Sequence, residues 1–166
     1  NMQIGDSVIK ILAIGDIVGK PGREVVRKKL PQLREEHAID FIIANGENAA
    51  HGIGITPEIS DELFFYNINV ITTGNHVWHN KQILGYIDRE RRLIKPANYP
   101  PSTAGAGYYL GKVKDRSICV INLMGRVFME PLDCPFRKFD DLYRDVAKNA
   151  DIVIVDFHAE ATSEKR

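Results

Sequence analysis

Short apolar runs alternate with segments of helical spacing along most of the chain. The runs that predict β-strands are residues 9–14, 41–44, 69–73 and 152–155. Apolar residues three and four positions apart predict helices from residue 57 onward and over residues 24–36, 80–87 and 139–148. The strand-like runs are apolar almost throughout, which is typical of strands that are buried on both faces. The pattern therefore predicts a layered α/β fold, with helices flanking a central, largely parallel or mixed sheet.

Two local signals refine this prediction. Pro31 lies inside the first helical segment, where a proline predicts a bend or an end of the helix. Residues 108–113 and 117–122 flank a short polar turn, KDR, and predict a β-hairpin.

A near-repeat occurs at the start of the chain, where IGDSV (4–8) is followed by IGDIV (14–18). Only the second copy follows a strand-like run. We therefore expect Asp6 to lie in a surface turn and Asp16 to lie just beyond the end of a strand.

Composition narrows the class of protein. The chain has 166 residues and equal numbers of Lys+Arg and Asp+Glu, 22 each. This length favours one domain, and the charge balance argues against an extended nucleic-acid groove while leaving room for a small phosphate site. The two cysteines, Cys119 and Cys134, do not predict a disulfide framework, so we expect a reducing, cytoplasmic location. The sequence has no apolar stretch long enough to span a membrane and no recognisable secretory leader.

Polar side chains follow each strand-like run at its carboxyl end. They are Asp16, Glu47, Asn48, Asn75, His76, Asp156 and His158. Ligands of α/β proteins bind outside the carboxyl ends of the strands, so we expect these side chains to meet at one edge of one sheet. Carboxylate, amide and imidazole ligands together suit a transition metal such as Mn, Fe or Zn.

Each of these residues also has an ordinary structural interpretation. Asp16 would serve as a cap, Glu47, Asn48 and Asn75 as turn residues, and His76 and His158 as partly buried histidines. It is their coincidence on four strand ends that favours a metal site.

Other polar residues give weaker signals. His79 and His51 are expected at the surface, and His37 is expected to cap a helix end. Asp156 would either orient His158 or bond a nearby loop. GKPGR (19–23) has little weight as a phosphate cradle, and Arg126 would hold a phosphate or fix its own loop.

The sequence resembles the calcineurin-like metallophosphoesterase superfamily and, within it, the YmdB-type branch of bacterial phosphodiesterases that act on 2′,3′-cyclic nucleotides. The matching segments are IGDIVGKPGR (14–23), IANGENAAHGIGIT (43–56), TTGNHVW (72–78), RLIKPANYPP (92–101), INLMGRVFM (121–129) and VDFHAEATSEK (155–165). GDIV lacks the histidine usual in the superfamily and GEN has glutamate where aspartate is usual, but the YmdB-type branch shares both departures.

The resemblance implies a site with two metal ions, Fe or Mn foremost and Mg or Zn as other choices. Asp16 would bind the first metal, Glu47 would bridge the two, and Asn75 and His158 would bind the second. Asn48 would contact the substrate phosphate. His76 would act as the general acid, a role that suits imidazole because it titrates near neutral pH. The implied substrate is a small phosphodiester, and the implied reaction is hydrolysis by metal-activated hydroxide.

The superfamily completes its site with a Gly-His-x-His segment after the strand that carries His158. The five histidines of this sequence include no His-x-His pair. We therefore expect residues 1–166 to be the N-terminal part of a single metallophosphoesterase domain, incomplete at the C-terminus, with little or no activity alone. An exposed sheet edge would then favour association into homo-oligomers.

The sequence leaves two alternatives to a phosphodiesterase. A catalytically inactive phosphate- or nucleotide-binding regulatory module fits the absence of the His-x-His pair. A P-loop or Rossmann nucleotide binder is disfavoured because neither glycine pattern is present.

Overall fold

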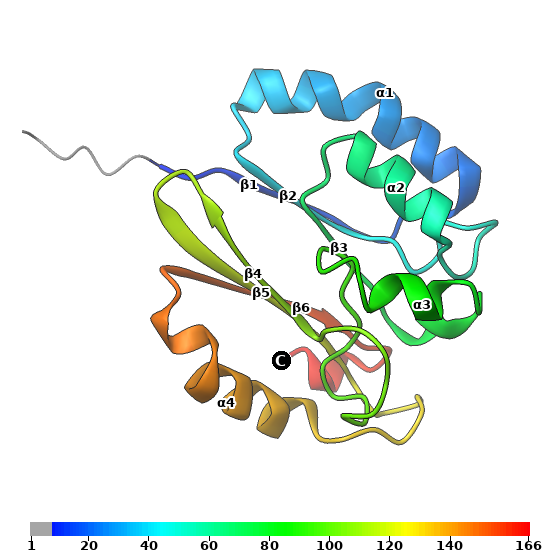
Figure 1. The fold of residues 1–166 in the computed structure, drawn as a ribbon, viewed down its shortest axis with the longest axis vertical. Coiled ribbons are helices and arrows are strands. Elements are labelled where there is room, and N and C mark those ends of the chain that lie inside the picture. The colour runs from blue at the N-terminus through cyan, green and yellow to red at the C-terminus, as the bar shows by residue number, and fades with distance from the viewer. Residues whose placement is uncertain (1–7) are drawn as a thin grey trace, which may run out of the picture.

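The computed structural model describes residues 8–166, in which two three-stranded sheets pack between two layers of helix. Helices α1 and α2 lie over the first sheet and helix α4 lies over the second, with the two sheets facing each other in between (Figure 1). The layered α/β fold predicted from the pattern is confirmed. Asp6, expected in a surface turn, lies outside the described residues.

The first sheet is parallel throughout. Its strands are β1 (Ile11–Ile14), β2 (Phe41–Asn45) and β3 (Val70–Thr72), in that spatial order. Helices α1 (Gly19–His37) and α2 (Pro57–Phe65) connect them. All five residues of β2 are buried, which agrees with the unbroken apolar run in the sequence.

The second sheet contains an antiparallel and a parallel pair. Strands β4 (Tyr108–Val113) and β5 (Arg116–Met124) form the predicted hairpin, and β6 (Ile152–His158) pairs parallel to β5. Helix α4 (Pro135–Asp145) precedes β6.

The expectation that the last strand shares a sheet with the first three is wrong. The free edge of β3 is occupied by the following segment, because Ile71 donates to Arg92 O at 2.8 Å and accepts from Ile94 N at 2.9 Å. With its backbone groups satisfied there, β3 cannot accept a further strand, and the hairpin begins a second sheet.

Helix α1 begins five positions before the predicted start and continues through Pro31. Of the two outcomes predicted for Pro31, a bend or an end, the end is wrong. The helix ends instead at Ala38, in the left-handed conformation, whose N–H bonds to the carbonyls of Arg34 and Glu35. Val26 and Leu30 pack into the core above the first sheet before the proline, and Ile39 enters the same core just after the helix, while residues 31–37 are exposed.

The remaining short elements differ from the predicted ranges by a few residues. Helix α3 (Ile83–Ile87) is shorter than predicted, and α4 begins and ends earlier. Single 3-10 turns form η1 (Asn75–Trp78), η2 (Ala147–Asn149) and η3 (Thr162–Glu164).

Three hydrophobic clusters fill the spaces between the layers. One lies between the first sheet and helices α1 to α3 and includes Ile42, Leu63 and Ile71. A second contains Ile43 and Val70 of the first sheet together with Val120 of the second, so it fills the space between the sheets. A third joins the second sheet to α4. Within residues 8–166, no helix combines the length and the hydrophobicity needed to cross a membrane.

Candidate metal and phosphate site

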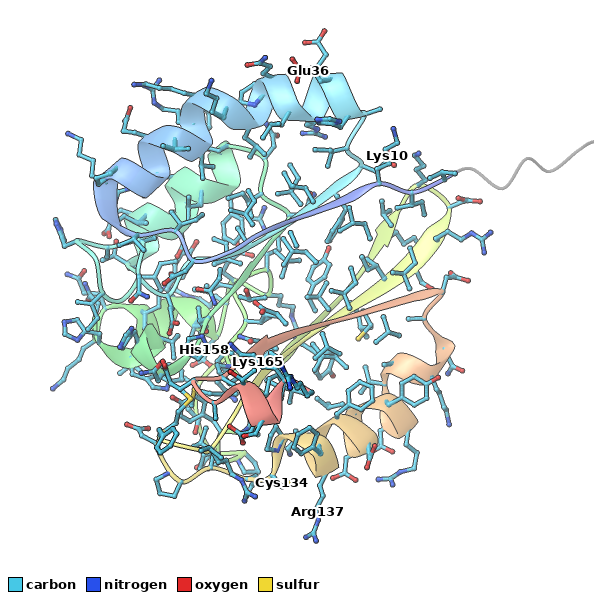
Figure 2. The ribbon with its side chains drawn as sticks, turned by 180° about the vertical axis from the view of Figure 1, so that it is seen from behind. Lys10, Glu36, Cys134, Arg137, His158 and Lys165 are labelled. Atoms are coloured by element: carbon cyan, nitrogen blue, oxygen red, sulfur yellow. The ribbon has the colours of Figure 1, made fainter. Side chains whose placement is uncertain are left out.

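Contacts between side chains join all six residues predicted for the site, although β6 belongs to the second sheet. In order along this series they are Asp16, Asn48, His76, Glu47, His158 and Asn75. Figure 2 shows His158 where β6 ends, shortly before η3. The structure therefore brings the six side chains to one end of the two-sheet sandwich.

Glu47 is the central residue of the series and is only 1% exposed. Its backbone N–H donates to Asn45 Oδ1 at 3.1 Å, which forms a tight turn directly after β2. One carboxylate oxygen, Oε2, accepts the backbone N–H of His76 at 3.0 Å, and the other, Oε1, lies 3.1 Å from His158 Nδ1. A buried carboxylate needs such partners or a cation, so its position marks the centre of the candidate site.

Gly74 lets the end of β3 approach this carboxylate. A Cβ atom at position 74 would lie 2.5 Å from Glu47 Oε2 and 2.8 Å from the His158 ring. No other residue type fits without moving one of these two groups.

Asn48 has an amide orientation that follows from its neighbours. Its Nδ2 donates to Asp16 Oδ2 at 2.7 Å, because an ionised carboxylate can only accept. Asn48 Oδ1 therefore faces His76 Nδ1, 2.7 Å away, and the imidazole must donate from that nitrogen. In neutral His76 the other nitrogen, Nε2, is then free of a proton and available to exchange one with a bound molecule.

Asn75 and His158 supply the remaining donor atoms. Asn75 Oδ1 lies 3.0 Å from His158 Nε2, so both ring nitrogens of His158 face an oxygen atom. Glu47 lies beside Nδ1 and Asn75 beside Nε2, so the two oxygens contact different nitrogens of the ring.

The donor groups at this site match a metal ion in type. Among residues 8–166, no three His, Cys, Asp or Glu side chains gather closely enough to form a metal site by themselves. Glu47, Asn75 and His158 supply carboxylate, amide and imidazole groups, the ligand types that suit a transition ion. To bind one ion together they would have to turn toward the same nitrogen of His158. Asp16 is exposed and its contact is with Asn48, so the first-metal position is less complete in this chain.

Several weaker candidates have structural partners instead. The Asp156 carboxylate accepts a hydrogen bond from the Thr72 hydroxyl, which links β6 to β3. Asp156 is therefore positioned by Thr72 and not by His158. Arg23 of the GKPGR segment donates to Glu62 and to Ala49 O. His51 and His79 are exposed, as expected, and so is Arg126.

One feature of the site was not identified from the sequence. A cavity of about 670 Å³ opens beside Asn75. Its other lining residues are Phe128, Met129, Glu130 and Glu160. Three of the four lie in the segments INLMGRVFM and VDFHAEATSEK, so the motif match contained a signal, but nothing in the spacing placed these residues beside Asn75.

The layered α/β fold thus carries carboxylate, amide and imidazole groups at its strand ends. The chain belongs to the family of YmdB-like proteins, whose family model matches residues 12–166.

Individual relatives agree with this assignment. A Bacillus subtilis (strain 168) protein named 2′,3′-cyclic-nucleotide 2′-phosphodiesterase is 46% identical over 157 residues, which are 95% of this chain and 60% of that protein. The crystal structure of a hypothetical protein from Thermus thermophilus aligns with a TM-score of 0.87 at 41% identity, covering 93% of this chain and 60% of that one. The crystal structure of a phosphatase from Mycoplasma pneumoniae also has a TM-score of 0.87, at 34% identity, covering 95% of this chain and 57% of that one. The chain thus spans about 60% of the length of the B. subtilis relative.

Proposed function

We propose that this chain is the N-terminal part of a metal-dependent phosphodiesterase that hydrolyses 2′,3′-cyclic nucleotides. The observation that carries the proposal is the unbroken series of contacts from Asp16 to Asn75 around the buried Glu47. The name of the B. subtilis relative supports the choice of substrate.

In this proposal Glu47, Asn75 and His158 hold one metal ion, and Asp16 shares Glu47 in holding a second. When bound, two such ions neutralise phosphoryl charge and activate a water molecule. Asn75 contributes a ligand without adding negative charge, so the site stays attractive to an anionic phosphodiester. Fe or Mn are the ions that this mixture of oxygen and nitrogen ligands suits best, with Mg or Zn as other choices.

Two further residues act on the substrate itself. Asn48 is placed by its bond to Asp16, and its amide would contact the phosphate. The His76 side chain is 38% exposed, so a bound molecule can reach it. With Nδ1 bonded to Asn48, His76 in its protonated form would donate from Nε2 to the leaving sugar oxygen.

The direct test is turnover by the full-length protein. We expect the Mn²⁺-loaded protein to open adenosine 2′,3′-cyclic phosphate to a nucleoside monophosphate, and the chelated protein to lose this activity and regain it with Mn²⁺. Metal-replete protein that binds the cyclic nucleotide without hydrolysing it would contradict the proposal and identify a binding module instead.

A further inference from the structure

Phe128 is an exposed aromatic residue at the rim of the cavity beside Asn75. Its side chain is 90% exposed, and its backbone φ is +64°, in the left-handed region that bulky residues rarely adopt. An exposed apolar ring and a strained backbone are both unfavourable for the isolated chain. Such residues concentrate at sites that bind a ligand.

The loop that carries Phe128 is fastened to the candidate site. The carboxylate of Glu164 accepts the backbone N–H groups of Arg126, at 2.9 Å, and of Val127, at 3.1 Å. Gly125 N donates to the backbone oxygen of His158 at 2.8 Å. The aromatic ring is therefore held in a defined relation to a proposed metal ligand.

The cavity between Phe128 and Asn75 has the size of a nucleotide site. Its volume of about 670 Å³ lies within the range typical of small-molecule pockets, roughly 300–1,000 Å³. Asn75, a proposed metal ligand, and Phe128 both line this cavity.

The charged residues that line the cavity indicate which kind of chemical group would bind against Phe128. Glu130 and Glu160 both line it, and no Lys or Arg of the described residues does. Two carboxylates disfavour a second phosphate there, whereas they suit a neutral planar group that carries N–H donors. A nucleobase has both properties.

We propose that Phe128 is the stacking platform for the base of a nucleoside 2′,3′-cyclic phosphate and determines the preference for nucleosides over smaller phosphodiesters. The inference rests on the proposed phosphodiesterase function and deepens it. In this arrangement the cyclic phosphate lies at the Glu47, Asn75 and His158 side, and the base covers the exposed ring.

The test compares two substrates of the full-length, Mn²⁺-loaded protein. One is adenosine 2′,3′-cyclic phosphate, and the other is methyl riboside 2′,3′-cyclic phosphate, which has the same sugar and phosphate without a base. Loss of base stacking costs about 1–3 kcal/mol, which is about 5- to 150-fold. We expect Phe128→Ala to lower kcat/KM for the adenosine substrate by about this factor, mainly through KM, and to leave the base-free substrate unchanged.

Phe128→Trp retains a stacking surface and should retain the preference. Val127→Ala is the matched control, because Val127 is also exposed but does not line the cavity. Saturation-transfer NMR with adenosine 3′-monophosphate gives a second measurement, in which the adenine protons should lose their signal only in Phe128→Ala.

The outcomes separate the two proposals. Equal losses on both substrates, or an adenine signal that survives in Phe128→Ala, would overturn the stacking role while leaving the phosphodiesterase intact. Wild-type protein that hydrolyses neither substrate would overturn the proposed function, and the stacking role with it.

Discussion

The candidate site has two parts that the fold assembles in different ways. The single-sheet group, Asp16, Asn48 and His76, comes entirely from loops that follow β1, β2 and β3. The cross-sheet group, Glu47, Asn75 and His158, takes two residues from the same loops and the third from the end of β6 in the other sheet.

The two groups therefore depend on different interactions. Parallel order alone places the ends of β1, β2 and β3 side by side, so the single-sheet group needs only the first sheet. The cross-sheet group forms only when the two sheets pack correctly. Polar bonds fix that packing near the site, from Thr72 to Asp156 and from Asn122 Nδ2 to Thr73 O at 2.8 Å. Metal binding at the cross-sheet group is thus expected to depend on sheet packing, and proton transfer by His76 on the first sheet alone.

The largest effect on turnover and metal content is expected at Glu47, which contacts both groups. Glu47→Gln keeps the shape of the side chain but removes the charge that would bridge both metals. In the full-length protein it should reduce turnover to the level of the chelated wild type and lower metal content at both positions, measured by elemental analysis. Full metal content in this variant would contradict the bridging role.

Within the single-sheet group, His76 should affect turnover without affecting metal content. His76→Ala removes the proposed general acid, so kcat should fall by about 10²–10⁴-fold. Metal content should equal that of the wild type in the same preparation. His79→Ala, an exposed histidine three positions away, is the control and should change neither quantity. A His76→Ala protein stripped of metal would show that the assignment of acid and ligand is wrong.

The cross-sheet group should show the opposite behaviour. Asn75→Ala removes a neutral ligand, so metal affinity should fall. Loss of an outer-shell partner lowers metal affinity by about 10- to 100-fold, and loss of a direct ligand should cost at least as much. Isothermal titration with Mn²⁺ measures the change. Unchanged affinity, with only turnover reduced, would move Asn75 into the group that acts on substrate.

The two positions should also differ in the 166-residue chain itself. Glu47, Asn75 and His158 form a set of three donors, whereas Asp16 has only the shared Glu47. We expect one ion per chain at the cross-sheet group and a weaker or empty position at Asp16, measured by anomalous scattering at the metal edge. Two fully occupied positions would contradict this unless a neighbouring copy supplies ligands.

The smallest expected effect is on stability. Thr72→Val removes the hydroxyl that bonds Asp156 across the two sheets, leaving a partly buried carboxylate without this partner. The free energy of unfolding should fall by about 1–3 kcal/mol, measured by urea denaturation. Thr162→Val, at an exposed position in η3, should be nearly neutral. Equal changes in both variants would indicate that the bond between the sheets contributes little.

Much of the molecule followed from the sequence. Apolar runs marked β1, β2 and β3. β2 and β3 are buried throughout, as an unbroken apolar run indicates, whereas β1, at the edge of the sheet, is only partly covered. The same pattern located the polar residues at their carboxyl ends, and parallel pairing then required those ends to be neighbours. The motif segments placed the chain in its family before the fold was known. The roles of the individual site residues are still predictions.

Other features depended on contacts between segments far apart in the chain. Helix α1 continues through Pro31 between two points of contact with the core, Val26 and Leu30 before the proline and Ile39 just after the helix. The division into two sheets depends on residues 92–94, which cover the edge of β3. No local sequence pattern predicts this contact.

By itself, the sequence determined which residues could do chemistry and which strand ends would carry them, since periodicity and turn residues act over a few positions. Only the tertiary structure decided that His158 reaches Glu47 from a second sheet, that Asp156 bonds Thr72 instead of His158, and that Phe128 borders the cavity beside Asn75. Those contacts arise from the packing of whole layers against a shared hydrophobic core, and such packing depends on the sum of many distant side chains instead of on any one segment.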